Sequence, residues 1–138
     1  LCAIDLDTVM NSTSLNDFGD AIRSYANTGD EDDRDLSRVG LSLEMFRAYT
    51  EGYLSQRAKQ LTDSEIDHLA FSARYITFEQ VLRFLMDYID GDTYYKIKYP
   101  DHNLVRTHAQ YRLLQSMEEH YGEMCRIVDG IAAKYRNA

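Results

Sequence analysis

Apolar residues recur every three or four positions along most of this 138-residue chain, the spacing of helices that bury one face. The pattern predicts a helix from about residue 17 to 26, a second from 42 to about 59, and a long third one over residues 62–89. After Pro100 the same spacing continues to Tyr135, as one long helix or as two helices broken near Gly122. The chain is therefore expected to be mostly α-helical.

Start and stop signals sharpen these boundaries. Asn16 or Asp17 can cap the first helix, Ser42 opens the second, and Thr62 with Glu65 fits a capping box. Gly91 is the natural left-handed residue to end the third helix. The acidic run at residues 30–35 is expected to be a solvated loop, and the aromatic stretch at 93–99 an irregular connection.

The N-terminus carries a different pattern. An apolar run at residues 1–4 leads into Asp5 and Asp7, which would share one face of an extended strand. Two hard oxygen donors on one face suit Mg²⁺, whereas an acid pair at such a place also serves as a turn or a helix cap. The expected fold is one helical domain over residues 1–138 with a short N-terminal strand.

Composition excludes several classes of protein. The net charge is −8 and no basic stripe exists, which argues against a nucleic-acid binder. No apolar run approaches the roughly 20 residues of a membrane span. Cys2 and Cys125 make no disulfide framework or zinc motif, so free thiols and a cytoplasmic location are expected.

Two segments together point to a family. Residues 4–8 read Ile-Asp-Leu-Asp-Thr, and residues 17–19 read Asp-Phe-Gly about a dozen positions later. Residues 83–94 read Arg-Phe-Leu-Met-Asp-Tyr-Ile-Asp-Gly-Asp-Thr-Tyr. The first pair of motifs resembles the metal-binding segment of the aminoglycoside phosphotransferase-like kinases, and the third string resembles their N-acetylhexosamine 1-kinase branch. The resemblance covers nearly the whole chain.

This resemblance implies the helical C-terminal subdomain of a protein-kinase-like fold. It implies ATP as co-substrate and Mg²⁺ held by Asp5, with Asp7 on a second ion or a metal-bound water. The family's nucleotide-binding lobe and its His-Gly-Asp catalytic loop have no counterpart in the sequence. We therefore expect a C-terminal fragment of a larger kinase that has no catalytic base, is inactive alone, and dimerises through its exposed strand.

The amino sugar would be held by hydrogen bonds and by an aromatic face. Arg83 and Tyr94 are the candidates for this role, with Tyr95 beside them at the mouth of the pocket. An ion pair of Arg83 with Glu79 or Asp87 explains the arginine equally well. Surface packing is an equally ordinary role for a tyrosine.

Other functions remain open at this point. The metal segment alone also fits a kinase of another small alcohol, such as choline, homoserine or an aminoglycoside. The long helices at the end of the chain also suit a helical interaction domain without catalysis. Relatives in this branch are sometimes labelled mucin-desulfating enzymes, but neither Cys2 nor Cys125 lies in the Cys/Ser-x-Pro/Ala-x-Arg context that a sulfatase needs.

Overall fold

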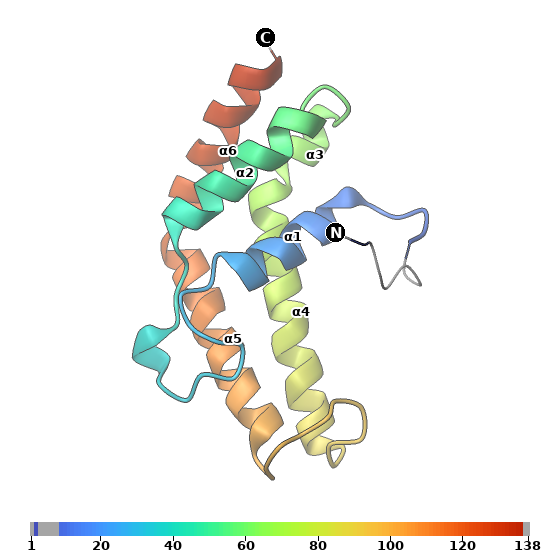
Figure 1. Ribbon diagram of the computed structural model, residues 1–138, viewed down its shortest axis with the longest axis vertical. Coiled ribbons are helices and arrows are strands. Elements are labelled where there is room, and N and C mark those ends of the chain that lie inside the picture. The colour runs from blue at the N-terminus through green and yellow to red at the C-terminus, as the bar shows by residue number, and fades with distance from the viewer. Residues whose placement is uncertain (1, 3–8, 137–138) are drawn as a thin grey trace.

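The computed structural model describes residues 2 and 9–136, which form a bundle of helices (Figure 1). Among these residues there is no strand beyond a single isolated bridge between Asn27 and Leu41. The helical character predicted from the sequence is thus confirmed. The expected strand at residues 1–8 lies outside the described part, apart from Cys2.

Most elements follow one another after five residues or fewer, and the two longer connections are residues 26–35 and 90–101. Their bounds are α1 Ser14–Tyr25, the 3₁₀ turn η1 Leu36–Arg38, α2 Leu43–Arg57, α3 Asp63–Asp67, α4 Leu69–Ile89, α5 His102–Glu119 and α6 Tyr121–Arg136.

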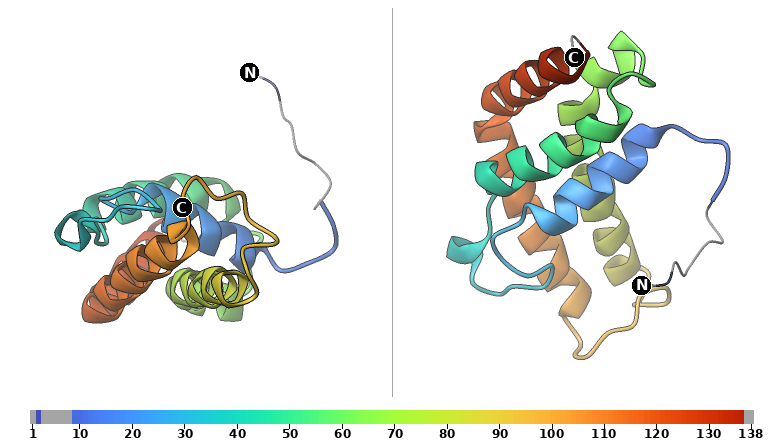
Figure 2. Two further views of the ribbon diagram at one scale, coloured as in Figure 1. Left: turned by 90° about the horizontal axis from the view of Figure 1, so that it is seen from below. Right: turned by 45° about the horizontal axis from the view of Figure 1, so that its top comes forward.

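The two longest helices, α4 and α5, run antiparallel and pack along their lengths, while α6 extends beyond α5 and packs on α2 (Figure 1). Seen along the bundle, α4 and α5 form one layer, and α1 and α2 lie across it (Figure 2). The fully buried side chains at the centre come from five helices: Phe18, Ile22, Phe46, Leu54, Leu69, Leu113, Met117 and Met124.

A close crossing joins α1 to α4 at Gly19. A Cβ atom at this position would lie 2.5 Å from the Ser72 carbonyl oxygen, which is closer than real contacts allow. The neighbouring Phe18 is fully buried against rings of α2. Phe18 and Gly19 of the Asp-Phe-Gly sequence therefore have a packing role in α1.

Two boundaries differ from the sequence prediction. The first helix begins at Ser14 and is capped by Thr13, whose Oγ1 accepts from the Leu15 amide at 3.3 Å, so the prediction of Asn16 or Asp17 as cap is wrong. Asp17 instead lies in the first turn, where a negative charge favours the helix dipole.

The long helix predicted over 62–89 is broken at His68. The His68 amide donates to Glu65 O, and the ring Nδ1 bonds Ser64 O at 2.7 Å. The side chain thus satisfies a carbonyl that a continuous helix would have paired with the backbone. His120 separates α5 from α6 with a similar Nδ1 contact to Ser116 O at 2.8 Å, so the alternative with two final helices is confirmed.

Candidate functional site at the turn between α4 and α5

The chain reverses sharply after α4. Gly91 has φ +90° and Asp92 has φ +58°, so two successive residues take left-handed backbone conformations. For a residue other than glycine this conformation needs local support. It comes from Asp87, whose carbonyl accepts from the Asp92 amide at 2.7 Å.

The side chain of Asp87 is the centre of the turn. Its Oδ1 accepts from the backbone amides of Thr93 and Tyr94 at 2.9 and 2.8 Å. Its Oδ2 accepts from the Tyr95 amide at 3.0 Å and from Asn103 Nδ2 at 2.8 Å. Asp87 is 6% exposed, so a buried carboxylate fixes three consecutive backbone amides in one conformation.

Burial alone raises the pKa of the Asp87 carboxyl. The hydrogen bonds from the Tyr95, Tyr94 and Thr93 amides and from Asn103 outweigh burial and hold this pKa below its ordinary value. The carboxylate therefore stays ionised at neutral pH.

Asn103 extends the hydrogen-bond network of Asp87 to α5. It is fully buried, and its Nδ2 also donates to Asp92 Oδ1 at 2.8 Å. Its Oδ1 accepts from Arg106 at 2.8 Å, and Arg106 donates to the Lys96 carbonyl at 3.3 Å. The 90–101 connection is thus tied to α5 at Asp92 and at Lys96.

A cavity of about 290 Å³ opens against this turn. It is lined by Arg83, Met86, Asp87, Asp90, Thr93, Tyr94 and Tyr95. Its size is near the lower end of the range for small-molecule sites.

The two predicted substrate-binding residues, Arg83 and Tyr94, lie together in this cavity. The Arg83 guanidinium is 5.7 Å from the ring centres of both Tyr94 and Tyr95, a cation–π arrangement. The two tyrosine rings meet edge to face at 4.8 Å, and Tyr94 is 73% exposed. The Tyr95 ring packs against the Phe84 ring, with the ring centres 4.8 Å apart, and the Tyr95 hydroxyl accepts a hydrogen bond from Gln80 Nε2 at 3.3 Å.

The alternative role for Arg83 was an ion pair on its own helix. Within the described part of the chain, no ion pair joins Arg83 to Glu79 or to Asp87. Asp87 has both carboxylate oxygens engaged by the turn and by Asn103. The guanidinium therefore faces the tyrosines and the open cavity.

Sequence reasoning missed the residues that build the turn, namely Asp87, Asn103 and Arg106. One signal was present: Asp87 is an acid in the last turn of a helix, where the dipole disfavours negative charge. An acid at such a place needs hydrogen-bond donors from outside its own helix.

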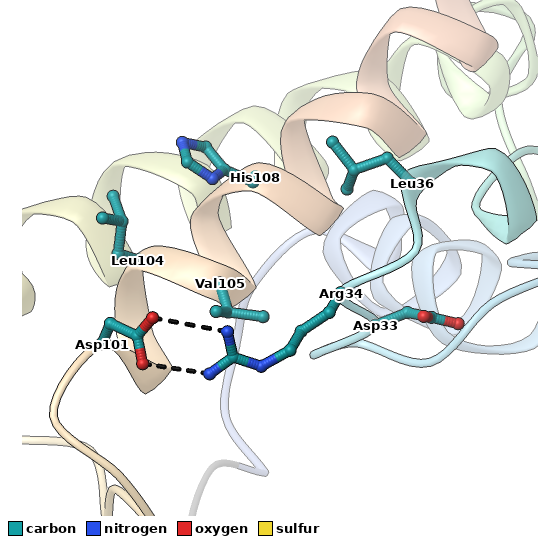
Figure 3. A pocket seen from close by; sticks show the side chains of 7 residues that line it. All are labelled: Asp33, Arg34, Leu36, Asp101, Leu104, Val105 and His108. Atoms are coloured by element: carbon teal, nitrogen blue, oxygen red, sulfur yellow. Dashed lines mark hydrogen bonds and ion pairs between the residues drawn. The ribbon is translucent and has the colours of Figure 1, made fainter.

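A second hollow, of about 220 Å³, lies between the 30–38 loop and α5 (Figure 3). An ion pair between Arg34 and Asp101, at 3.0 Å, crosses its rim, and Arg34 also covers the Tyr99 ring at 4.6 Å. The Asp33 carboxylate turns away from this pair (Figure 3). The hollow is thus partly filled by a contact that fastens the loop to α5.

Fully buried His102 anchors the same loop. Its Nδ1 accepts from the Lys98 amide at 3.1 Å, so Nε2 carries the proton and donates to Asp32 Oδ2 at 2.8 Å. That hydrogen bond, above all, holds the pKa of Asp32 below its ordinary value. The acidic loop is therefore only partly solvated as predicted, since Asp32 and the buried Asp33 make structural contacts.

The predicted metal ligands Asp5 and Asp7 lie outside the described residues. Among the residues that are described, no group of three or more His, Cys, Asp or Glu side chains could hold a metal ion. The Mg²⁺ assignment stays a prediction.

A comparison with protein-family models gave no match to the chain. No helix in the described part is both long and apolar enough to cross a membrane.

Proposed function

We propose that this chain is the C-terminal, helical part of an ATP-dependent kinase that phosphorylates the anomeric hydroxyl of an N-acetylhexosamine. The cavity at the turn between α4 and α5 would hold the sugar. The observation that carries the proposal is the placement of Arg83 over Tyr94 and Tyr95 at the open side of that cavity.

The residues that line this cavity suit a neutral N-acetylated amino sugar. The Arg83 guanidinium can donate to sugar hydroxyls or to the acetamido carbonyl, and the Asp90 carboxylate can accept from hydroxyls. The exposed Tyr94 ring offers a flat apolar face to the C–H groups of a pyranose. Because Asp87 fixes the backbone of Tyr94, this surface is preorganised, which reduces the entropy lost on binding.

Phosphoryl transfer needs further groups. Mg²⁺, when bound, neutralises charge on the β- and γ-phosphates of ATP. Asp5 is the residue that would hold it, and Asp7 would bind a second Mg²⁺ or a metal-bound water. No catalytic base is assigned in this chain, so turnover is expected only from a longer protein that includes it.

The sugar site can be tested on the chain itself. Titration with N-acetylglucosamine or N-acetylgalactosamine, followed by protein NMR, should shift the amides of residues 93–95. Arg83→Ala should weaken binding by about 10-fold or more, as expected for a lost hydrogen bond to a charged group. Arg47→Ala, which changes an exposed arginine on α2, should leave binding unchanged. Absence of shifts with both sugars would reject the sugar site.

The reaction is tested in a longer protein that carries this chain. Incubation with Mg·ATP and either sugar should give a sugar 1-phosphate signal in phosphorus NMR, and Asp5→Ala should abolish it. If ATP is untouched with every amino sugar, the assignment fails and a kinase of another alcohol takes its place. Turnover by the isolated 138-residue chain would contradict the assignment of the base to another segment.

A further inference from the structure

Helix α4 is apolar on two sides. One side faces the core through fully buried residues such as Leu69, Ala73 and Phe84. A second set of large apolar side chains is exposed by 42–71% each, and we call it the outer row. The outer row consists of Phe71, Tyr75, Phe78, Leu82, Met86 and Ile89.

The outer row is one continuous stripe. Its steps of four, three, four, four and three residues keep all six side chains within an arc of about 80° at 100° per residue. The stripe is about 27 Å long at 1.5 Å per residue. A helix that is apolar on opposite sides is normally covered on both.

The area is that of an interface. Taking roughly 200 Å² for each side chain when fully exposed, the six exposures together amount to about 600 Å² of apolar surface. The lower limit for a specific interface is also about 600 Å² for each partner.

The order of side chains in the outer row fits a second copy of itself. The N-terminal half is aromatic, with Phe71, Tyr75 and Phe78, and the C-terminal half is aliphatic. In an antiparallel pair, Phe71 would lie opposite Ile89 of the second copy, and Phe78 opposite Leu82. Each flat ring then meets a flexible aliphatic chain, whereas a parallel pair would place like against like.

The surface beside the aromatic half of the outer row has a groove that can receive an aliphatic side chain of the second copy. A groove of about 170 Å³ lies between α4 and α5, lined by Phe71, Tyr75, Phe78 and Leu114 together with Arg74 and Glu118. Arg74 and Glu118 pair with each other at 3.1 Å, so the charged lining is internally neutralised. The remaining lining is apolar and suits Ile89 of a second copy.

We propose that the outer row of α4 is a homodimer interface in which two copies of this chain pair through antiparallel α4 helices. This inference does not rest on the sugar site, although Met86 belongs both to the outer row and to the lining of that cavity. It also differs from the dimer expected through an exposed N-terminal strand, because the contact is between helices.

Sedimentation and light scattering on the 138-residue chain test the interface. The chain should show twice its 16.0 kDa mass at micromolar concentration. Leu82→Glu should raise the dimer dissociation constant by about 100-fold or more, because each interface would bury two unpaired charges. Leu36→Glu is the matched control, since Leu36 is similarly exposed at 39% but lies in η1. It should leave the dimer intact.

Crosslinking tests the direction of the helices. In a Cys2→Ser, Cys125→Ser background, a mixture of Phe71→Cys and Ile89→Cys chains should form a covalent dimer on oxidation, whereas each variant alone should not. Crosslinks within each variant alone would overturn the antiparallel pairing. If the folded chain is still a monomer at about 100 μM, the homodimer is rejected. The outer row would then be the binding surface for a different protein segment.

Discussion

The Asp87 carboxylate, in the last turn of α4, accepts a 2.8 Å hydrogen bond from the Asn103 side chain, in the first turn of α5. Sixteen positions separate the two residues in the chain, and both are buried. This contact closes the reversal between the two longest helices, and the other oxygen of the same carboxylate fixes the backbone amide of Tyr94. The shape of the candidate sugar site therefore depends on a pair that does not itself have to touch the ligand.

Replacing Asp87 should loosen the turn and leave the bundle folded. In Asp87→Ala, the amides of Thr93, Tyr94 and Tyr95 lose their acceptor, so their hydrogen exchange should become at least about 10-fold faster. Amides in the middle of α5 should keep their protection. Asp90→Ala is the control, because Asp90 is an exposed acid only three residues away. Unchanged exchange at residues 93–95 in Asp87→Ala would show that the turn is held by other contacts.

Acid should open the same turn. The pKa of Asp87 is held below its ordinary value of 3.8, so its stabilising contribution is fully present above pH 3.8 and is lost as the pH falls through the lower folded value. Asp32, held by His102, behaves in the same direction. Near-ultraviolet circular dichroism of the tyrosines should therefore change as the pH falls below 3.8. The Asp87→Asn variant should lose part of this transition, and an identical profile would exclude Asp87 as its source.

The crossing of α1 and α4 should not tolerate a methyl group. Gly19→Ala would place a Cβ 2.5 Å from Ser72 O, so the variant should lose about 1–3 kcal/mol of unfolding free energy, measured by urea denaturation. Gly52→Ala is the matched control on α2, where a Cβ meets no atom within 4 Å. There the higher helix propensity of alanine should add about 0.5–1 kcal/mol. Equal effects of the two substitutions would contradict the close crossing.

The start of α3 depends on a reciprocal cap. Thr62 Oγ1 accepts from the Glu65 amide at 3.2 Å, and the Glu65 carboxylate accepts from the Thr62 amide at 2.8 Å. Thr62→Ala should therefore cost about 1 kcal/mol of stability. Thermal unfolding of this variant beside Ser55→Ala, an exposed position within α2, checks the value. A Thr62→Ser variant should retain most of the stability, because its hydroxyl can accept the same bond.

Local sequence determined most of the helices and several of their ends. Ser42 and Thr62 cap where predicted, Gly91 takes the left-handed conformation after α4, and Phe46, Thr50 and Leu54 form the buried stripe of α2. These features depend on groups within one or two turns of each other, so spacing and residue type were enough to predict them. Arg83 and Tyr94 could also be singled out as candidates.

Contacts between segments decided the rest. The donors of Asp87 come from beyond a chain reversal, and its role follows from that reversal and not from its neighbours on α4. The break at His68 is an exception, because its ring reaches the Ser64 carbonyl only four residues away and the contact is local. The spacing placed Leu69, Ala73, Val81 and Phe84 in the buried row of α4, and all four are buried, whereas Tyr88, expected in the same row, is 37% exposed. Only the packing of α1 and α5 on the core side shows that the opposite side of α4, the outer row, stays uncovered.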